Sequence, residues 1–450
     1  MLRYLKAAGL AVGLFAAPAI SAILTNAGPL TLEQCVAMAL ESNLRIGIAN
    51  EKINEVSSAV REASASRLPK LSAQASYTRL NESNTVSGLV PVAPDPGTGV
   101  FGGVVPFEVN LGANVYSTGV TLTQPIYTGG RITNARRIAN YGLSASTWQQ
   151  KSTVREVKRD VTKAYYSVLA ANKSLEALDS AIVLMEALTR DLSNAVDVGM
   201  RGEHELLQAQ VQLLNQRFAR QQAASGVNAA AVFLAALIGH PVNTPLMLVK
   251  DIASPDPLDL PELTVLQAKA RDASADLKAL EEQLNIVETS ARIAGAAYIP
   301  SVFAAAGYTG QGTGFESDRW RNSANISLIA QWDIFDGGAA SERRRQALSQ
   351  MRQIELGMEN LRIMLDMQVK NNRTALEDAF AGIETAASNI EQSKRSYEIS
   401  YDRYQAGILL SSELLNAQNL SLQAEISYYR ALSDFYAKLA DLDYLVNFDN

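Results

Sequence analysis

Residue types that commonly carry catalysis or bind metals are scarce in this sequence. It has two histidines, His204 and His240, and one cysteine, Cys35. Structural zinc sites combine about four histidine, cysteine or carboxylate ligands, and here no histidine is paired with a cysteine. No Ser–His–Asp arrangement is visible either. We therefore predict a protein that is not an enzyme and that uses no metal or cofactor, and we interpret His204 as a solvated turn residue.

A glycine-rich stretch has part of the pattern of a phosphate-binding loop. Gly310, Gly312 and Gly314 alternate with other residues, but a P-loop also needs a Lys-Ser/Thr pair and a position between a strand and a helix. Because neither is present, we interpret the stretch as a flexible loop. The net charge of −6 argues against sequence-independent binding of nucleic acid, which requires a basic surface.

The N-terminus has the pattern of a secretory signal. Arg3 and Lys6 precede an apolar run from residue 7 to residue 17, and small residues follow at possible cleavage sites. A membrane-anchoring helix is the alternative, but the run is shorter than the ~20 apolar residues that span a bilayer, and Pro18 follows it. We predict a signal peptide at residues 1–22. We interpret Cys35, beyond this run, as a half-buried residue of an amphipathic helix rather than a lipoprotein acylation site.

The element that must position any functional residue is a long helix predicted at residues 131–196. From Val154 to Met185, apolar or small residues recur at alternating steps of three and four, the heptad pattern of a helix that packs along other helices. No proline interrupts it. The part from Asn134 to Val196 alone would extend roughly 95 Å, far more than the width of a small domain, so its apolar seam requires other long helices as neighbours.

The whole pattern occurs twice along the chain. Three pairs of landmarks are 208 positions apart and two pairs are 231 apart: Gly129 and Gly337, Gly199 and Gly407, Glu205 and Glu413; Pro69 and Pro300, Tyr77 and Tyr308. The two spacings differ by 23, which indicates a longer loop between the first two strands, where insertions are tolerated. Constant spacing of several landmarks in the same order predicts an internal duplication.

Each repeat has the pattern helix, strand, loop, strand, long helix, turn and helix. The first repeat (31–238) is predicted to hold helices at 31–43 and 45–66, strands at 71–80 and 109–122 around a loop at 81–108, the long helix at 131–196, a turn at 197–204 and a helix at 205–238. A proline-rich connector is predicted at 239–262. The second repeat (263–446) is predicted to hold one helix at 263–296, strands at 300–309 and 322–332 around a loop at 310–321, the long helix at 338–404, a turn at 405–411 and a helix at 412–446.

The predicted strands are about ten residues long, which is enough to cross a bilayer when they are tilted. One chain supplies only four of them, and an open sheet edge is not tolerated in lipid. Closing a barrel therefore requires other copies of the chain: two copies supply eight strands and three supply twelve. Trp320 and Trp332 flank the second pair of strands, and they are candidates for an interfacial aromatic girdle, with core packing as the alternative.

At these landmarks the chain resembles the TolC-like outer-membrane efflux proteins. The resemblance covers essentially the whole chain after the predicted signal. Its most specific parts are the strand starts at Pro69 and Pro300, the Gly-Gly turns before the long helices, and the motif Glu-Leu-Leu-x-Ala-Gln behind each hairpin turn, at residues 205–210 and 413–418.

The resemblance implies a mainly α-helical fold with a membrane β-barrel. The duplicated protomer would form a homotrimer with a twelve-stranded barrel in the outer membrane of a Gram-negative bacterium, continuous with a twelve-helix periplasmic α-barrel. The proline-rich connector at 239–262 would lie at the equator of that α-barrel. The implied partners are other copies of the chain, a periplasmic adaptor protein, an inner-membrane pump or ABC exporter, and outer-membrane lipid, with no nucleic acid among them.

The resemblance also implies that rings of acidic side chains close the periplasmic aperture. Four carboxylates lie within about three helical turns of a turn glycine, and two arginines accompany them: Asp191, Asp197, Glu398 and Asp402; Arg190 and Arg403. In a trimer each carboxylate occurs three times around a narrowing tube, where it repels anions and holds cations. Asp402 is the preferred candidate because it lies beside Tyr401 and Tyr404. Ordinary solvated helix charges are the alternative.

The two turns are also candidates for docking the helical hairpin of an adaptor. Glycine permits a sharp turn, and the neighbouring residues are apolar where a free turn should be polar. The first turn matches the family's Val-Gly-Leu-like motif as Val198-Gly199-Met200, whereas the second, Ala406-Gly407-Ile408, has Ala in place of Val. Packing within the hairpin is the alternative, also for Leu409 and Leu410.

The sequence thus predicts a passive, trimeric outer-membrane exit duct, gated at the periplasmic helical turns, that passes substrates from an inner-membrane pump and adaptor out of the cell. A periplasmic coiled-coil adaptor or structural protein that never enters the membrane is the alternative. The four alternating strands argue against that alternative.

Overall fold

The computed structural model describes residues 29–79, 85–91, 104–110, 114–249, 251–313 and 320–448. The predicted signal peptide, residues 1–22, lies outside these ranges. The chain divides into two compact units. One unit holds the chain up to Ile48, Ser152–Ser274 and the chain from Met364 onward; the other holds Ala49–Lys151 and Ala275–Ile363. We refer to them as the turn unit and the sheet unit, after the elements that each contains.

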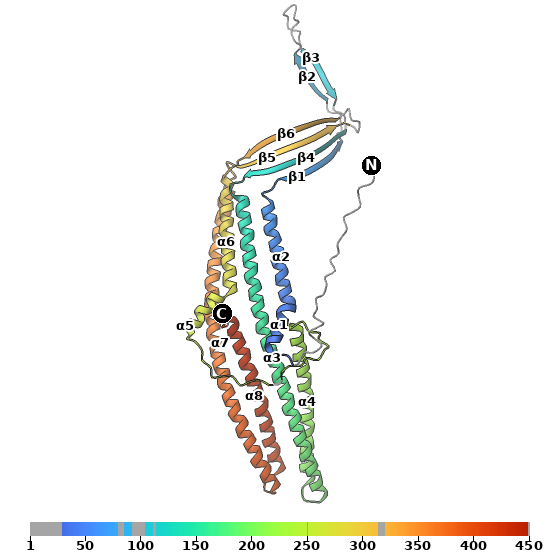
Figure 1. The fold of residues 1–450 in the computed structure, drawn as a ribbon, viewed down its shortest axis with the longest axis vertical. Coiled ribbons are helices and arrows are strands. Elements are labelled where there is room, and N and C mark those ends of the chain that lie inside the picture. The colour runs from blue at the N-terminus through green and yellow to red at the C-terminus, as the bar shows by residue number, and fades with distance from the viewer. Residues whose placement is uncertain are drawn as a thin grey trace, which may run out of the picture. The chain divides into compact units, whose positions relative to one another are not determined.

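Two long helices of equal length dominate the chain (Figure 1). Helix α3 (Arg131–Asp197) and helix α7 (Ala339–Gln405) each have 67 residues, so the two predicted long helices are confirmed. Both start directly after a Gly-Gly turn whose glycines have φ between 61° and 88°. Residues with side chains rarely adopt this left-handed conformation, so the Gly-Gly pairs redirect the chain from strand to helix.

The sheet unit contains a four-stranded antiparallel sheet in the order β1-β4-β5-β6. Its strands are β1 (Lys70–Arg79), β4 (Asn114–Tyr127), β5 (Ser301–Gly312) and β6 (Trp320–Gln331). The two strands of the first repeat therefore lie beside the two strands of the second. Helices α2 (Leu44–Ala65) and α6 (Ala275–Gly295) accompany α3 and α7 in this unit, and a short 3-10 turn, Ala296–Tyr298, joins α6 to β5.

The predicted loop at 81–108 is wrong in part. It contains β2 (Thr85–Pro91) and the start of β3 (Val104–Asn110), which pair with each other in a separate two-stranded sheet. Glycines and prolines in this stretch suggested a loop, but both strands are rich in valine, whose branched side chain favours strands.

The second predicted strand, 109–122, is displaced in the structure to β4 at Asn114–Tyr127. It continues through Pro125, beyond the predicted end at residue 122. Its pairing with β5 shifts register between Pro125 and Tyr127, and a bulge of this kind is a place where a strand tolerates proline.

The predicted glycine loop from residue 310 is also partly wrong, because Gly310 and Gly312 lie within β5. A Cβ atom at Gly310 would lie 2.8 Å from Asn322 Oδ1 and 3.2 Å from the Trp320 ring. Glycine therefore permits close packing of neighbouring side chains here, rather than flexibility.

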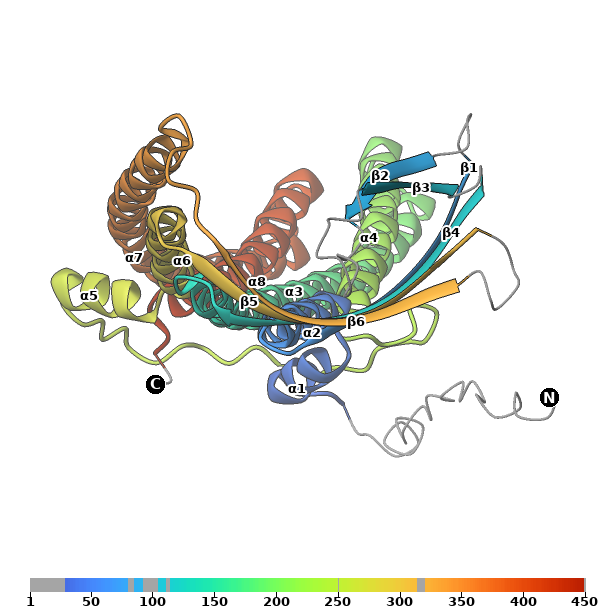
Figure 2. The ribbon, with the colours of Figure 1, turned by 90° about the horizontal axis from the view of Figure 1, so that it is seen from above.

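The turn unit is helical. It contains α1 (Leu32–Ser42), α4 (Glu203–Leu237), α5 (Leu263–Ala273), α8 (Ser411–Val446) and the remaining parts of α3 and α7. In Figures 1 and 2 its long helices follow the order α7, α8, α3, α4. The predicted seam of α3 is confirmed at Val157, Val161 and Val168, which are buried together with residues of α1 and α4.

Cys35 on α1 is fully buried in this core, so the predicted half-buried position is wrong. Burial raises the pKa of its thiol to about 11, which keeps it protonated near neutral pH. Helix α1 starts with a capping box, in which the Thr31 hydroxyl accepts a hydrogen bond from the Gln34 backbone and the Gln34 side chain accepts one from the Thr31 backbone.

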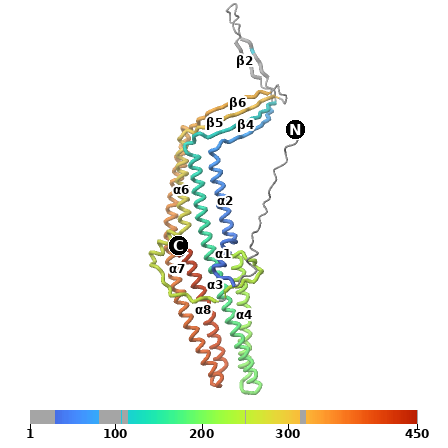
Figure 3. The backbone as a smooth tube through the Cα atoms, in the orientation of Figure 1, coloured from blue at the N-terminus to red at the C-terminus, as the bar shows by residue number. Residues whose placement is uncertain are grey.

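The single helix predicted at 263–296 is wrong, because the chain breaks at Ser274 into α5 and α6. Ser274 is extended, with ψ of 110°. Asn43, which lies 231 positions earlier between α1 and α2, is extended in the same way, with ψ of 126°. The duplication therefore includes the break. The backbone tube in Figure 3 shows both short helices leading into longer ones.

Residues 239–262 contain no helix or strand in their described part, and Leu248 forms an isolated parallel bridge to Leu30. Among the described helices, none has the length and hydropathy of a membrane-spanning helix.

Candidate functional site at the helical turns and the sheet

The turn between α3 and α4 has the geometry of a Schellman motif. Gly199 has φ of 75°, the Gly199 backbone N–H donates to the Val196 carbonyl at 2.9 Å, and the Met200 N–H donates to the Ala195 carbonyl at 2.8 Å. The turn between α7 and α8 repeats this arrangement. Gly407 also has φ of 75°, and the equivalent bonds, each 208 positions later, measure 3.0 and 2.9 Å. The two turns are therefore the same backbone structure built twice.

Both turns expose large apolar side chains. Met200 is 78% exposed and Ile408 is 77% exposed, and Val198 and Leu410 are also exposed. Exposing a large apolar side chain forgoes about 1.5–3 kcal/mol of burial free energy. Packing within the hairpin, the alternative for these residues, is therefore contradicted within the chain. Leu409 is different, because it packs against the core beneath the turns.

The predicted gate charges lie near the turns but do not contact one another. Asp191, Asp197, Asp402 and Arg403 are exposed, and their side chains make no hydrogen bond or ion pair within the described part of the chain. Glu398 is already engaged, since its carboxylate lies 3.0 Å from Arg395 on the same helix. Within one chain these residues are solvated charges, and a ring of them can arise only from several copies.

Sequence reasoning missed a contact between the two hairpins. The Arg201 guanidinium lies 5.1 Å from the centre of the Tyr404 ring, and Arg201 Nη1 lies 3.4 Å from Glu205 Oε2. Burial raises the pKa of Tyr404, Arg201 lowers it, and Glu205 and Asp191 raise it. One signal for this contact was available: the position equivalent to Arg201 in the second turn is Leu409, a difference within otherwise matching turns.

A shared apolar core beneath the turns holds the hairpins together. It joins side chains from α3, α4 and α8: Met185, Leu188, Leu192, Ala209, Leu414 and Leu415. Two polar contacts add to it, from Gln212 Nε2 to Asn419 Oδ1 at 2.7 Å and from Gln418 Nε2 to the Ala181 carbonyl at 3.2 Å. The amide of Gln216 is buried in the same unit without a hydrogen-bond partner in the described part of the chain.

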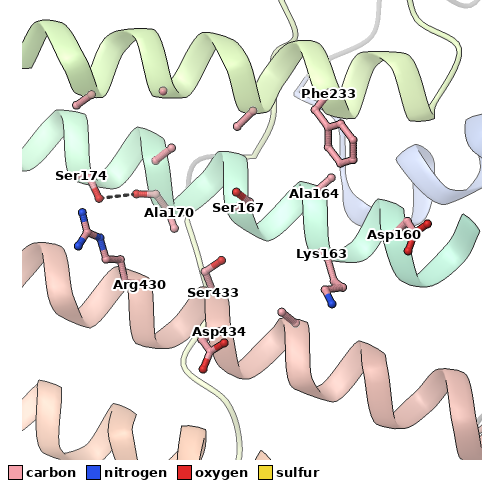
Figure 4. Close-up of a pocket in the computed structure, with 15 residues that line it drawn as sticks. Asp160, Lys163, Ala164, Ser167, Ala170, Ser174, Phe233, Arg430, Ser433 and Asp434 are labelled. Atoms are coloured by element: carbon pink, nitrogen blue, oxygen red, sulfur yellow. Dashed lines mark hydrogen bonds between the residues drawn. The ribbon is translucent and has the colours of Figure 1, made fainter. Parts of the chain in front are cut away.

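A groove of about 720 Å³ runs between α4 and α8 over α3 (Figure 4). Its floor consists of small residues of α3, including Ala164, Ser167 and Ala170. Two polar side chains on it are engaged locally: Ser174 donates to the Ala170 carbonyl at 2.9 Å, and Lys163 pairs with Asp441 at 2.9 Å. Among the described residues that line the groove, no serine hydroxyl is hydrogen-bonded to an acidic or basic side chain.

The histidines take no part in a metal site in the described ranges. His204 is exposed in the first turn of α4, as predicted for a solvated turn residue, and a ring nitrogen lies 2.9 Å from Gln208 Nε2. Within the described residues, no group of three or more histidine, cysteine or carboxylate side chains has the arrangement of a metal site.

One face of the four-stranded sheet is apolar and exposed. Directly paired residues share a face of a sheet, and the pairings Leu71–Leu122, Val120–Tyr308 and Ala306–Ile326 follow one face across all four strands. Seven large side chains on this face are between 41% and 90% exposed: Leu71, Tyr77, Val120, Leu122, Tyr308, Ile326 and Leu328. A soluble protein rarely exposes such a continuous patch.

The opposite face of the sheet is mainly polar. It carries Ser72, Thr121, Thr309 and Ser323, and the hydroxyls of Thr309 and Ser323 lie 2.9 Å apart. Phe303 and Ile329 are apolar exceptions on this face. Alternation of apolar and polar residues gives the sheet one surface suited to lipid and one suited to water.

The two tryptophans occupy the two ends of β6. Trp332, just after the strand, is 57% exposed, and its ring N–H donates to the Tyr298 carbonyl at 3.1 Å. Trp320 is the first residue of β6 and is partly exposed. Core packing, the alternative for Trp332, is contradicted within the chain, and a place in an aromatic girdle stays a prediction for both.

Comparison with known proteins identifies the family. A family model described as outer membrane efflux protein matches residues 35–240 and 266–447. Protein CyaE of Bordetella pertussis is 26% identical over 321 residues, which cover 68% of this chain and 65% of CyaE, just under two thirds of its length. The pyoverdine export outer membrane protein OpmQ of Pseudomonas aeruginosa is 23% identical over 434 residues, covering 89% of this chain and 84% of OpmQ.

Solved structures agree on the fold. The CmeC outer membrane channel of Campylobacter jejuni superposes with a TM-score of 0.74 at 19% identity, covering 92% of this chain and 85% of CmeC. CusC superposes with a TM-score of 0.74 at 16% identity, covering 94% of this chain and 95% of CusC. The predicted resemblance and the duplicated, mainly helical protomer with its antiparallel sheet are confirmed. The chain belongs to the outer membrane efflux protein family.

Proposed function

We propose that this chain is the protomer of a trimeric outer-membrane exit duct, through which an inner-membrane pump and a periplasmic adaptor export substrates. The sheet contributes four strands to a membrane barrel, and the helices form the staves of a periplasmic tube that is gated at the Gly199 and Gly407 turns. Family membership supports the outer-membrane location and the export role. The trimeric assembly is inferred mainly from one observation: helix α3 has helices on both sides, whereas helix α7 lies at an edge.

Helix α3 has helical neighbours on both sides along its length. In the sheet unit it bonds to α6 through Ser144 and Glu282 at 2.7 Å, and it meets α2 where Gln150 bonds to Asn50 at 3.3 Å. In the turn unit it pairs with α4 through Glu186 and Arg217, and with α8 through the stacked rings of Tyr166 and Tyr436. Helix α3 therefore lies inside the row of helices, with a neighbour on each side.

Helix α7 and helix α4 lie at the two edges of the turn unit (Figure 2). On α4, a stripe of apolar residues at helical spacing is more than half exposed: Leu207, Val211, Leu214 and Phe218. The positions 208 residues later on α8 are Leu415, Asn419, Leu422 and Ile426. Three of these are buried, and they pack in the core clusters that include α3. The duplication thus supports packing of the α4 stripe against α7 of another copy.

The sheet supports the same conclusion. Strands β1 and β6 are its edges. Each leaves backbone groups that have no strand partner among the described residues, and a membrane would not tolerate such groups. Three copies would supply twelve strands, join each β6 to a neighbouring β1 and enclose the polar face. The apolar face would then meet lipid.

A pair of cysteine variants tests the α4–α7 contact. Ile426 on α8 and Leu178 on α3 pack in one core cluster within a chain. At a spacing of 208 residues, Phe218 on α4 is the equivalent of Ile426, and Ala386 on α7 is the equivalent of Leu178. Phe218 of one copy is therefore expected to lie beside Ala386 of the next. Mild oxidation of Phe218→Cys/Ala386→Cys should give covalently linked trimers in denaturing gels. The matched control, Ile426→Cys/Leu178→Cys, should form its disulfide without changing the number of linked chains. Native Cys35 is fully buried and should not react. Monomeric bands for the first variant would contradict the proposed assembly.

Conductance in planar bilayers tests the duct itself. The purified protein should give ion-conducting channels, and its absence from the soluble periplasmic fraction after osmotic shock should separate it from the alternative of a periplasmic coiled-coil protein. For the gate we keep Asp402 as the first candidate. Asp402→Asn should increase the open fraction or reduce cation preference, whereas Glu398→Gln, which removes an already paired charge, should do so less. Equal currents from both variants and from the unmodified protein would contradict a gating role for Asp402.

A docking role for the exposed turns remains part of this proposal. Met200 and Ile408 offer apolar contacts of the kind that a helical hairpin of an adaptor would cover. Met200→Asp and Ile408→Asp should each weaken copurification with an adaptor while leaving conductance intact. Unchanged copurification would place the adaptor contact elsewhere.

A further inference from the structure

A set of arginines surrounds the helix ends next to the sheet. Arg61 on α2 and Arg292 on α6 are 231 positions apart, and Arg136 on α3 and Arg344 on α7 are 208 apart, so each repeat supplies one of each pair. Every one lies within three to five residues of the helix end nearest the sheet, or roughly 5–8 Å along the helix axis. The four arginines therefore form one level, although the chain as a whole carries a net charge of −6.

Two of these arginines stand on the same side of the α2–α3 pair. Helix α3 meets α2 at Gly142 and Gln150, and α2 meets α3 at Val56 and Asn50. Successive residues of a helix are rotated by about 100° around its axis. On each helix, the arginine is therefore rotated by about 80° from the mean direction of the two contact residues, Arg136 on α3 and Arg61 on α2. Because the two helices run in opposite directions, equal offsets place both arginines on one side. The duplication places Arg292 and Arg344 on the corresponding side of α6 and α7.

That side continues the apolar face of the sheet. Arg131, five residues before Arg136, points about 140° away from it, and its guanidinium donates to Ser301 Oγ at 2.7 Å. Ser301 lies on the same face of β5 as Thr309, whose hydroxyl meets Ser323 on the polar face. The direction of Arg131 therefore marks the polar side, and the four arginines lie toward the apolar side.

Exposed apolar and aromatic residues lie where the strands lead into this level. Ile126 and Tyr127 are the last two residues of β4. They are at least half exposed, and so are Ile334 and Phe335, 208 positions later. The order along the chain is thus an apolar strand face, an apolar and aromatic collar, and then arginines. A membrane surface has the same order of hydrocarbon, interface and charged headgroups, with aromatic residues at the interface.

The arginines are largely free to bind an anion. Within the described part of the chain, Arg61 donates only to Ser57 and Ser58 on its own helix, and Arg136 and Arg344 make no ion pair there. Arg292 is the exception, because it pairs with Glu288 at 2.6 Å. The guanidinium group binds phosphate through two parallel hydrogen bonds, which suits a phospholipid headgroup.

From this placement we propose that Arg61, Arg136 and Arg344, with a contribution from Arg292, form a binding site for the phosphate headgroups of anionic phospholipids in the leaflet facing the periplasm. This inference rests on the proposed insertion of the sheet in the membrane. It adds a specific lipid contact, which fixes the depth of the protein in the bilayer by charge as well as by apolar surface.

Native mass spectrometry of the detergent-solubilised protein tests the site, with phosphatidylglycerol and phosphatidylethanolamine titrated separately. The triple variant Arg61→Gln/Arg136→Gln/Arg344→Gln should bind phosphatidylglycerol more weakly, by about fivefold for each arginine that contacts the headgroup, and should bind phosphatidylethanolamine as before. The control Arg352→Gln/Arg362→Gln/Arg395→Gln removes the same charge from arginines that are each paired with a glutamate on their own helix. It should retain the preference for phosphatidylglycerol.

Three results would overturn the proposal. They are equal affinity of the unmodified protein for the two lipids, equal loss of both lipids in the triple variant, and equal loss of phosphatidylglycerol in the triple variant and the control. Displacement of phosphatidylglycerol by an equal concentration of inorganic phosphate would identify a site for free phosphate instead. Conductance in a neutral bilayer separates this test from the proposed function, because channels that conduct but show no lipid preference contradict only the lipid site.

Discussion

Helices α3 and α7 are copies that differ in their surroundings. Each has 67 residues and follows a Gly-Gly turn, and a glycine with φ of 75° lies two residues after its end. Yet 14 residues of α3 are buried, compared with eight of α7. The buried residues of α7 form mainly one stripe at heptad spacing, including Leu365, Val369, Leu376 and Ile383. Local sequence makes both helices, and the presence of a second neighbour distinguishes them.

The difference in burial between α3 and α7 indicates which helix surfaces lack a partner within one chain. A helix with neighbours on both sides buries two apolar stripes, and a helix at an edge buries one. In the proposed assembly, the unburied stripe of α7 and the exposed stripe of α4 would therefore form an interface between copies. The two turns differ in a similar way, because Arg201 of the first turn contacts Tyr404 of the second, whereas its equivalent, Leu409, packs into apolar core.

The largest effect is expected when a buried leucine of α8 and its exposed equivalent on α4 are each replaced by alanine. Leu422 on α8 is buried, whereas its equivalent on α4, Leu214, is 62% exposed. Leu422→Ala should lower the free energy of unfolding by about 2–5 kcal/mol in any oligomeric state. Leu214→Ala should change the unfolding of the separated chain by less than about 0.5 kcal/mol and should instead promote dissociation of the trimer in detergent. Circular dichroism during denaturation measures the first quantity, and unheated gels measure the second. Equal destabilisation of the separated chain by both variants would show that α4 is not an edge.

The next effect depends on alkaline pH. Burial, followed by the charge of Tyr436, raises the pKa of Tyr166 on α3 to about 12, while the equivalent position on α7 is Thr374, which does not titrate. Tyrosine ionises near pH ~10 in an unfolded chain. The stabilisation by protonated Tyr166 is therefore fully present below about pH 10 and is lost as the pH rises toward 12.

We expect this loss to reach at most about 2 kcal/mol, because the ring is partly exposed. Urea denaturation at pH ~8 and ~11 measures it. Tyr166→Phe should reduce the alkaline loss without abolishing it, since burial also raises the pKa of Tyr436 and Tyr165. An alkaline loss as large in Tyr166→Phe as in the unmodified protein would contradict the assignment.

A smaller effect should be equal in both repeats. Gly199→Ala and Gly407→Ala each force a side chain into a left-handed conformation, which costs about 1–2 kcal/mol. Apart from the two neighbouring residues of the chain, no atom of the described residues lies within 4 Å of a Cβ at either position, so the cost is that of backbone strain. Gly202→Ala, in an ordinary conformation with φ of −82° and the same open space, is the control and should be nearly neutral. Unequal losses at Gly199 and Gly407 would show that the two turns are not equivalent in solution.

The smallest effect is expected from a substitution that makes the two turns alike. Arg201→Leu gives the first turn the residue found at the equivalent position of the second. It should cost about 0.5–1 kcal/mol through loss of the contact with Tyr404, and it should raise the pKa of Tyr404 further, because Arg201 lowers it. Ultraviolet titration detects the shift when the signal of a Tyr404→Phe variant is subtracted. A Tyr404 pKa unchanged by Arg201→Leu would show that the two side chains do not interact.

Much of the fold could be predicted from patterns within short stretches. The heptad spacing of Val157, Val161 and Val168 predicted α3, and the 208-residue spacing predicted α7, because side-chain periodicity and turn glycines act locally. The errors also have local causes. Glycines and prolines around the valines of β2 and β3 led to a predicted loop in their place. Ser274 broke a helix in which no glycine or proline marked an end. Comparison with Asn43 in the first repeat would have indicated that break.

By itself the sequence determined the elements, their order and their duplication, since each depends on residues that are close along the chain. Only the tertiary structure decided which copies of these elements are interior and which are edges. Leu214 and Leu422 are the same residue type at equivalent positions of the two repeats, and they differ in burial. Contacts such as Arg201 with Tyr404 join residues far apart in the chain, and the arginine level at Arg61 and Arg136 arises only when antiparallel helices bring their ends together. These features depend on the relative placement of distant segments, which no spacing along the chain records.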